Sequence, residues 1–379
     1  MADAEAVNAV AAGSIEAING VAKADIQAIN GVGLPAAGAT LWTLVAEDGG
    51  VGTAAASDLN DWTCYVSALM AGTQDYISIA YGKDGSGDPL WVVASSNSAR
   101  ELRYTADPTA GVDAWSDAST DNNMQSVAWG NNVWVATGGN GEVRRSTDGA
   151  SWTKLDLSGV TGWASDVGIF EVVTDGLGNW MFGQKTSVFS STDDGATWAR
   201  VIDFTSWSGT DLASTYEART MAYTAGRWSV FLRKSSQSRV YHAVSADTSA
   251  WTIAQVGGAD ATAQAIVSQG ARRMAAGDGT VIIVAGNDTS RSTDGGQNWT
   301  KNANDLPRTD ARDVATDGVG NWVVVHDSGR VSISTNNGDS WTEQTGVQDG
   351  GSNTNMRFPS GGANVENLEA VASNVIMPV

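Results

Sequence analysis

Short runs of apolar residues recur along most of this chain, each separated from the next by a few polar or glycine residues. Val281-Ile-Ile-Val-Ala285 and Trp322-Val-Val-Val-His326 are typical, and they have the length of a buried strand rather than of a membrane span. Between such runs lie turns rich in Gly, Asn and Asp, as in Asp175-Gly-Leu-Gly-Asn-Trp180 and its near copy Asp317-Gly-Val-Gly-Asn-Trp322. Turns of this composition connect β-hairpins, so the pattern predicts an all-β protein.

A second turn, which closes on a tryptophan, repeats at longer intervals, and we call its copies the tryptophan turns. The fullest forms are Ser191-Thr-Asp-Asp-Gly195-Ala-Thr-Trp198 and Ser292-Thr-Asp-Gly-Gly296-Gln-Asn-Trp299, while the copy at 334–341 has Asn336 in the Asp position. Altered copies end at Trp62, Trp115, Trp152 and Trp251. The seven tryptophans are 53, 37, 46, 53, 48 and 42 residues apart, which is the period of a repeat architecture.

Each residue type in the tryptophan turn has a physical role. An Asp or Asn early in a tight turn accepts hydrogen bonds from backbone N–H groups, and the Gly adopts a positive φ at little steric cost. The Trp buries a large ring against the next layer. We therefore assign structural roles to Asp148, Asp193, Asp247, Asp294, Asn336, Trp62, Trp115, Trp152, Trp198, Trp251, Trp299 and Trp341.

One repeat reads as strand, Gly-Asn turn, strand, link, strand, tryptophan turn, strand, which is a four-stranded propeller blade. Six repeats are complete, and a seventh is split between the two ends of the chain. Residues 367–373 and 375–379 resemble its two inner strands, and residues 40–45 with the turn to Trp62 resemble its two outer strands. Pairing them would leave no exposed sheet edge. We predict a seven-bladed β-propeller of antiparallel blades over residues 40–379, with six or eight blades as alternatives.

Residues 1–39 form a separate extension that contains three tandem 11-residue units, at 3–13, 14–24 and 25–35. Each unit opens with Asp or Ser, which are good helix N-caps, and two contain Asn-Gly, a helix stop. A short helical extension is predicted, either as capped turns or as one helix of 11-residue period. Its apolar stripe is too small to fold alone and is expected to dock on another protein or on the propeller, unless the segment is disordered. The candidate docking residues are Ile15, Ile18, Val21, Ile26, Ile29 and Val32.

Composition narrows the classes of partner. The chain has 42 acidic and 22 basic residues and a formal charge of −20, which disfavours nucleic acid and anionic membranes. Its one cysteine, Cys64, excludes an intrachain disulfide framework, and residues 1–6 do not resemble a secretory signal. No membrane insertion is expected.

The motif Ser-x-Asp-x-Gly-x-x-Trp resembles the Asp-box, or BNR repeat, of sialidases and related β-propellers. That resemblance would imply an arginine triad, a Tyr/Glu nucleophile pair and an Asp acid/base. The sialidase Arg-Ile-Pro motif has its nearest match here in Arg357-Phe-Pro359, in the wrong blade. Guanidinium groups are available at Arg219, Arg272, Arg273 and Arg312, and Tyr216-Glu217 is the one adjacent Tyr–Glu pair. No catalytic residue is assigned on this basis.

Metal and cofactor sites are not predicted either. His242 and His326 lie far apart in sequence, have no neighbouring Cys, and are interpreted as strand residues. The Asp residues of the tryptophan turns lack the spacing of an EF-hand loop. There is no Gly-x-x-x-x-Gly-Lys phosphate loop.

The Ile-Asn-Gly-Val-Ala-Lys unit of the extension, residues 18–23, resembles the leading segments of tailed-bacteriophage virion proteins. The resemblance implies a non-enzymatic virion structural protein, made in the host cytoplasm and attached to a tail or capsid in several copies. Its partners would be other virion proteins, contacted through residues 1–35, and a host surface glycan or receptor. The alternatives are a glycan-binding or glycan-hydrolysing sialidase-like propeller, and a cellular assembly factor of the kind found among Asp-box propellers.

Overall fold

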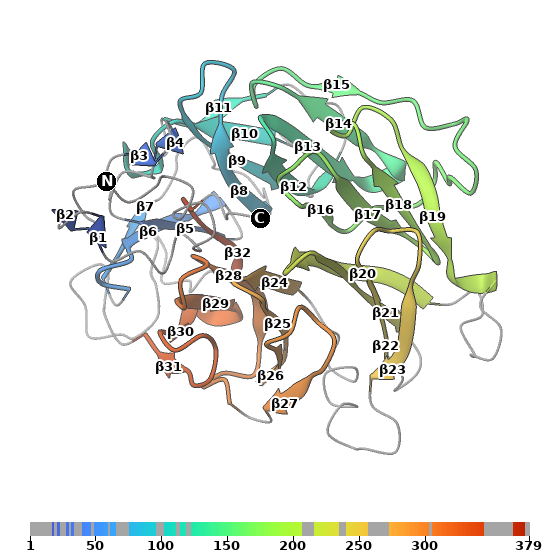
Figure 1. The fold of residues 1–379 in the computed structure, drawn as a ribbon. Coiled ribbons are helices and arrows are strands. Elements are labelled where there is room, and N and C mark those ends of the chain that lie inside the picture. Colours follow the sequence, from blue (N-terminus) through green and yellow to red (C-terminus); the bar gives the residue numbers. More distant parts are fainter. Residues whose placement is uncertain are drawn as a thin grey trace. The chain divides into compact units, whose positions relative to one another are not determined.

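A computed structural model of the chain describes residues 40–46, 49–59, 61–65, 76–95, 102–110, 114–118, 123–206, 216–234, 240–256, 273–302, 305–344 and 367–375, with four two-residue strands before residue 40. The chain divides into two units, residues 1–40 and residues 41–379. The second unit is the predicted propeller. It contains seven sheets of four antiparallel strands arranged around a centre (Figure 1).

Six blades are continuous in sequence, and we number them 1 to 6 in chain order. Blade 1 consists of β8 (Tyr76–Lys83), β9 (Pro89–Ser95), β10 (Leu102–Thr105) and β11 (Ser116–Asp117). Blade 2 consists of β12 (Met124–Gly130), β13 (Val133–Gly138), β14 (Val143–Ser146) and β15 (Thr153–Lys154). Blade 3 consists of β16 (Val172–Thr174), β17 (Trp180–Gln184), β18 (Ser187–Ser191) and β19 (Ala199–Asp203). Blade 4 consists of β20 (Tyr216–Thr224), β21 (Arg227–Lys234), β22 (Val240–Ser245) and β23 (Thr252–Val256). Blade 5 consists of β24 (Arg273–Gly277), β25 (Thr280–Ala285), β26 (Asp288–Ser292) and β27 (Thr300–Asn302). Blade 6 consists of β28 (Ala311–Thr316), β29 (Trp322–His326), β30 (Arg330–Ser334) and β31 (Thr342–Glu343).

The seventh blade is split between the chain ends, but not as predicted. Its order is β32 (Leu368–Ser373), β5 (Leu41–Ala46), β6 (Val51–Ala55) and β7 (Trp62–Tyr65). The C-terminal segment therefore supplies one strand and the N-terminal segment three, where two and two were expected. Residues 41–55 form a tight hairpin in which the N–H of Ala46 donates to the carbonyl of Gly50 at 3.0 Å, and β32, from the other end of the chain, pairs with the first strand of this hairpin. Residues 376–379, expected to add a strand, lie outside the described residues.

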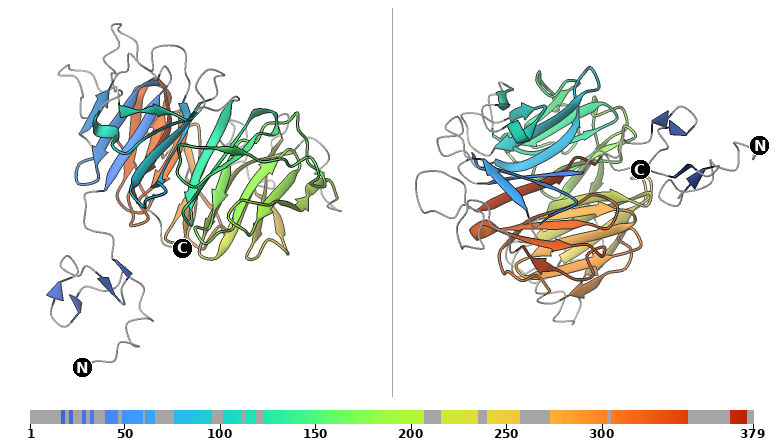
Figure 2. Two further views of the ribbon diagram at one scale, coloured as in Figure 1. Left: turned by 90° about the horizontal axis from the view of Figure 1, so that it is seen from above. Right: turned by 90° about the vertical axis from the view of Figure 1, so that its left-hand side faces the viewer.

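The second strand of each blade explains the apolar runs in the sequence. Every residue of β13, β17, β25 and β29 is buried. These strands are covered on both faces by neighbouring blades, as the edge-on views in Figure 2 illustrate, so alternation of polar and apolar residues disappears. The innermost strands differ, since β28 and β32 mix buried and half-buried positions.

The tryptophan turns connect the third and fourth strands of the blades. In blade 3 the Ser191 hydroxyl accepts the N–H of Gly195 at 3.0 Å and donates to Asp193 at 2.7 Å. Asp193 also accepts the backbone N–H of Thr197 at 2.9 Å, so the carboxylate bonds within its own turn. In five copies the indole N–H donates to the carbonyl three residues earlier, at distances of 2.7 to 3.0 Å: Trp62, Trp152, Trp198, Trp251 and Trp299.

The glycine of the turn is required by packing as well as by backbone geometry. Gly338 has φ +75°, and a Cβ there would lie 2.1 Å from Ile282 Cδ1 in the preceding blade. Gly195 has φ +73°, and its Cβ would lie 2.8 Å from Val135 Cγ2, again in the preceding blade. The tryptophan turns therefore also hold adjacent blades together.

The helical prediction for the extension is wrong at the residues that the structure describes. Residues Ala17–Ile18 (β1) pair with Val21–Ala22 (β2), and Ala28–Ile29 (β3) pair with Val32–Gly33 (β4), all antiparallel. Each pairing leaves a two-residue Asn-Gly connection in the sequence, which is the strongest short hairpin signal. The hairpin preference of Asn-Gly thus prevailed over its role as a helix stop. Of the candidate docking residues, Ile18, Val21, Ile29 and Val32 lie in these strands, whereas Ile15 and Ile26 lie outside the described residues.

Helical structure among the described residues is limited to short 3-10 segments: η5 (Pro108–Ala110), η7 (Gly139–Gly141), η8 (Phe204–Ser206) and η9 (Asp327–Gly329). In the described part of the chain, no helix has the length and apolar character needed to cross a membrane.

Candidate functional site

The innermost strands of the seven blades lie around the centre of the propeller (Figure 1), and their described residues line a pocket at each end of what we call the central channel. Each begins at one end of the channel and ends at the other. In blades 1 to 6 a turn there leads to the second strand of the blade, whereas in the seventh blade the second strand, β5, comes from the other end of the chain. Side chains near the strand starts accept backbone N–H groups from the next blade, in the pairs Ser78 with Val127, Ser126 with Val172, Glu171 with Met221, and Asp313 with Val371. We call the end where these strands begin the arginine end, and the opposite end the turn end.

Arg273 of blade 5 reaches across the channel at the arginine end. Its guanidinium donates to the carbonyls of Ile77 and Phe170 at 3.2 Å each, which belong to blade 1 and to the approach to blade 3. It also lies 3.6 Å from the carboxylate of Glu171. One side chain therefore joins three parts of the ring that are distant in sequence.

Two carboxyl groups face this guanidinium. Burial raises the pKa of Glu171 to about 7, even though Arg273 favours the charged form, and Asp313 adds to the increase. Burial likewise raises the pKa of Asp313, and Arg273 again opposes the change. With one cation between two carboxyl groups, a proton retained on Glu171 near neutral pH limits the net charge in the channel.

The other predicted guanidinium groups at this end are also paired. Arg219 binds Glu217 at 2.7 Å and covers the ring of Phe170, with its Cζ 3.9 Å from the ring centre. Arg312 binds Asp327 and lies 3.5 Å from Glu369. No guanidinium of Arg219, Arg273 or Arg312 is left without a carboxylate to bind an incoming anion.

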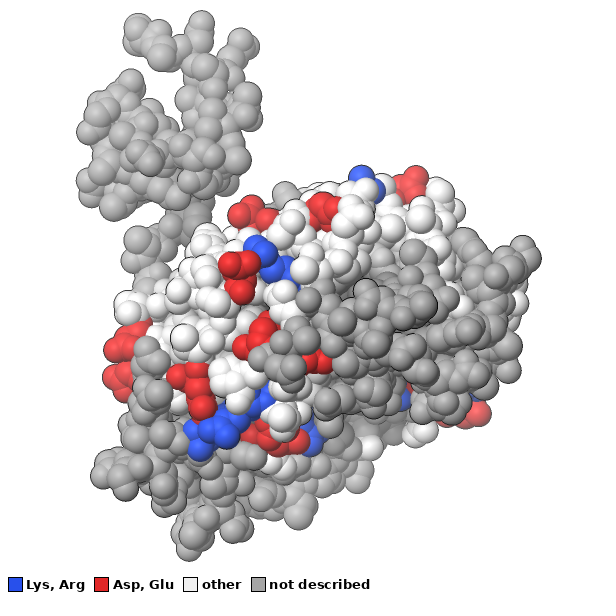
Figure 3. Space-filling view, turned by 90° about the horizontal axis from the view of Figure 1, so that it is seen from below, with Lys and Arg blue, Asp and Glu red and all other residues white. Residues whose placement is uncertain are grey.

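Two of the features considered for a sialidase-like site cannot be placed on the propeller. Arg272 and the segment Arg357-Phe-Pro359 are outside the described residues, and Tyr216 is described only as a strand residue of β20. Elsewhere on the propeller, arginines pair in the same way, as Arg308 and Arg330 do with Glu343. Figure 3 shows basic side chains beside acidic ones on one side of the molecule.

The histidines lie in strands, in agreement with their assignment from sequence. His242 packs between Phe231 and Trp299, with ring centres 4.9 and 5.4 Å away. Burial lowers its pKa to about 4, so the ring is neutral at physiological pH. His326 shares a 2.8 Å hydrogen bond with Ser332. Within the described residues, no group of three or more His, Cys, Asp or Glu side chains is arranged to hold a metal ion.

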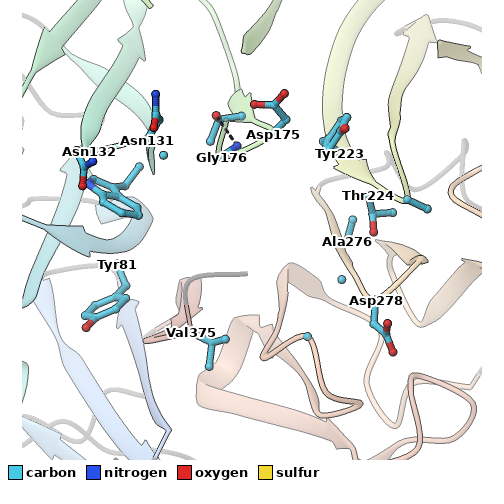
Figure 4. Close-up of a pocket in the computed structure, with 16 residues that line it drawn as sticks. Tyr81, Asn131, Asn132, Asp175, Gly176, Tyr223, Thr224, Ala276, Asp278 and Val375 are labelled. Carbon is cyan, nitrogen blue, oxygen red and sulfur yellow. Dashed lines mark hydrogen bonds between the residues drawn. The ribbon is translucent and has the colours of Figure 1, made fainter. Parts of the chain in front are cut away.

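The turn end of the channel opens into a cavity of about 440 Å³, which is within the usual size of small-ligand pockets. Every blade contributes to its wall, and Figure 4 shows Tyr81, Asp175, Tyr223, Asp278 and Val375 around one opening. We call this cavity the turn-end mouth.

Three aromatic residues occupy equivalent positions in the turn-end mouth. Tyr81, Trp129 and Tyr223 lie near the ends of β8, β12 and β20, each paired with a tryptophan of the second strand in its blade. The equivalent residues of other blades are Thr174, Thr316 and Ser373. Trp129 belongs to no tryptophan turn, and its place in the sequence alone indicates no function. The period of the Gly-Asn turns would have aligned all three rings.

Polar side chains from the turns complete the mouth. Asp175 is buried and bonded within its own turn, accepting the N–H groups of Leu177 and Asn179. Asn132 and Asp278 are exposed and line the cavity. No Lys or Arg is among the described residues that line it.

The near-identical turns of blades 3 and 6 also reach this end. Asp317 repeats the bonds of Asp175, accepting the N–H groups of Val319 and Asn321. Because these turns satisfy their polar groups internally, their apolar tips remain in solvent, and Leu177 and Val319 are 67% and 79% exposed. They are the large hydrophobic residues most exposed among those the structure describes.

Comparison with known proteins identifies the fold but no family. No protein-family model matches the chain, and no curated protein matches its sequence. Solved structures are similar in fold. YCF48 from Cyanidioschyzon merolae has 12% identity and a TM-score of 0.51, with 71% of this chain and 84% of that chain covered. The computationally designed Ika8 protein has 9% identity and a TM-score of 0.50, with 86% of each chain covered.

The structure of YCF48 bound to D1 peptide has 16% identity and a TM-score of 0.49, with 71% of this chain and 80% of that chain covered. Identities in this range show a shared propeller fold and nothing more. The resemblances to Asp-box proteins and to virion proteins remain predictions.

Proposed function

We propose that this chain is a non-enzymatic structural protein of a tailed-bacteriophage virion, in which residues 1–35 attach a propeller of the Asp-box type to a tail or capsid protein. The observation that carries the proposal is the tandem 11-residue repeat, set in a unit separate from the propeller. Its described hairpins are two residues per strand, and isolated hairpins of this size are marginally stable in water. A partner surface would supply the missing burial.

The arginine end supports a non-enzymatic role. A sialidase-like site needs guanidinium groups free to bind a substrate carboxylate, yet Arg219, Arg273 and Arg312 are neutralised by carboxylates of this chain. The buried carboxyl groups of Glu171 and Asp313 accept backbone N–H groups of the next blade. These contacts join blades and leave little capacity for acid–base chemistry on a ligand.

Mass spectrometry of purified particles from the source tests the proposal directly. The chain is expected among the virion proteins in more than one copy per particle, and its absence would refute a virion role. Deletion of residues 1–35 should give a propeller that folds but no longer copurifies with particles. Full incorporation of the truncated protein would instead place the attachment surface on the propeller.

A glycan-binding propeller is the second candidate, and the turn-end mouth is the observation that favours it. Three aromatic rings and exposed polar side chains around one opening are a recognisable ligand site. Hydrolysis is the weaker form of this candidate. Incubation of the purified protein with a glycan panel, followed by detection of new reducing ends, would separate binding from turnover.

A further inference from the structure

We propose that the turn-end mouth binds a neutral saccharide, which stacks on Tyr81, Trp129 and Tyr223 and hydrogen-bonds to Asn132 and Asp278. The inference rests on the second candidate function, the glycan-binding propeller, for which it names the ligand class and the contact residues, and it does not depend on the virion role. It places the ligand at the turn end of the channel, opposite to the arginines that the sialidase resemblance would use.

The aromatic rings provide the stacking surface. The face of an aromatic ring carries a partial negative charge, which attracts the polarised C–H groups of a pyranose. Tyr81 packs against Trp91 with ring centres 5.0 Å apart, and Tyr223 packs against Trp228 at 4.7 Å. Because a second ring supports each of them, these side chains lose little conformational entropy when a ligand binds.

The position of Trp129 depends on a glycine in the neighbouring blade. A Cβ on Gly82 would lie 2.1 Å from the Trp129 ring. Trp129 therefore packs against the backbone of blade 1 at Gly82, while Tyr81 of blade 1 and Tyr223 of blade 4 contribute from other parts of the wall. A saccharide of more than one ring could therefore contact aromatic side chains on different parts of the wall.

Hydrogen-bonding capacity remains available at the mouth. Among the described residues, the hydroxyls of Tyr81 and Tyr223 and the side chains of Asn132 and Asp278 have no hydrogen-bond partner. Asn offers both donors and an acceptor, and Asp offers acceptors, which match the hydroxyl groups of a saccharide. In contrast, Asp175 is occupied by its own turn.

Charge selects a neutral ligand. The described lining contains Asp175 and Asp278 but no Lys or Arg, so a carboxylate or phosphate would be repelled without compensation. The guanidinium group of Arg219 is at the other end of the channel, since Arg219 lies near the start of β20 and Tyr223 near its end. Arg227, which pairs with Thr224 at the turn end, is not among the residues that line the mouth. Sialylated glycans are therefore excluded from this mouth.

The test is calorimetric titration of the full chain with maltotriose, cellotriose, chitotriose and lactose, and with sialyllactose as the anionic counterpart of lactose. At least one neutral oligosaccharide should bind with a Kd below about 5 mM. Tyr223→Ala should weaken that binding by about fivefold or more, and Tyr223→Phe, which keeps the ring, should weaken it less. Tyr81→Ala provides a second variant if Tyr223→Ala fails to fold.

Arg219→Ala is the matched control, because it removes a side chain from the same inner strand at the arginine end. It should leave the Kd for the neutral oligosaccharide unchanged. The proposal is overturned if none of the neutral probes binds at about 10 mM, if binding survives in both alanine variants at the mouth, or if sialyllactose binds and Arg219→Ala abolishes that binding. Particle mass spectrometry tests the virion proposal independently, so none of these binding results would confirm or refute it.

Discussion

Glu171→Gln is expected to flatten the pH dependence of the propeller's stability. The Glu171 carboxyl group is buried in the channel, accepts the N–H of Met221 at 2.6 Å and lies 3.6 Å from Arg273. Burial raises its pKa from the ordinary value of 4.5 to about 7. The folded protein therefore holds this proton more tightly than the unfolded chain does.

The sign and size of the effect follow from linkage. A raised folded pKa gives a stabilisation that is complete below pH 4.5 and is lost as the pH rises through about 7. The difference between the two values corresponds to roughly 3 kcal/mol. Glutamine cannot ionise but retains an oxygen that accepts the Met221 N–H, so the variant should lose much less stability over the same interval.

Urea unfolding at a series of pH values between about 4.5 and 8 would measure this difference, with the fluorescence of the 16 tryptophans as the signal. Glu217→Gln is the matched control, because it makes the same chemical change at a side chain that is 38% exposed and paired with Arg219. The control should keep the wild-type slope. Parallel stability curves for wild type and Glu171→Gln would refute the reasoning.

Three further predictions concern the packing of the blades. Gly338→Ala should destabilise the protein by about 2–4 kcal/mol in urea unfolding, because it combines a positive φ with a Cβ 2.1 Å from Ile282. The control, Gly226→Ala, has φ +69° and open space around it and should cost about 1–2 kcal/mol. Equal losses of stability in the two variants would contradict the packing argument. Asp294→Ala should lower the thermal midpoint of unfolding at pH 7 but have little effect near pH 2. Burial of the Asp294 carboxyl is outweighed by hydrogen bonds that lower its pKa to about 2, so the stabilisation is lost as the pH falls through that value. An unchanged midpoint at pH 7 would count against the role of Asp294 in the turn. Arg273→Met should cost about 3–5 kcal/mol in unfolding free energy, since it leaves two carboxyl groups without a counter-ion, and a loss near zero would show that the channel contacts are dispensable.

The sequence predicted the blades well because a blade is a local object. Its four strands follow one another within about 45 residues. The tryptophan turns and the Gly-Asn turns carry Asp residues that bond within their own turn, as Asp193 and Asp317 do. The extension shows the limit of local reasoning. Asn-Gly is compatible with a helix end and with a hairpin, and the flanking Ile18 and Val21 decided for the hairpin by pairing with each other.

The closure of the ring and the contacts in the channel could not be predicted from local sequence patterns. Whether the C-terminal segment gives one strand or two depends on which edge it meets, and that edge is formed by residues 41–55 at the other end of the chain. The contact between Arg273 and the carbonyl of Ile77 joins residues 196 positions apart. No period in the sequence relates them, because the contact exists only after the ring has closed.

By itself, the sequence determined a repeated four-stranded blade, the turns that build it, and a distinct repeat in residues 3–35, since these rest on interactions between near neighbours. The tertiary structure decided that Arg219, Arg273 and Arg312 pair with carboxylates, and that Tyr81, Trp129 and Tyr223 line the opposite mouth. The physical reason is that each blade contributes only part of the lining of the channel. A site built from seven such contributions acquires its chemistry only when the ring brings them together.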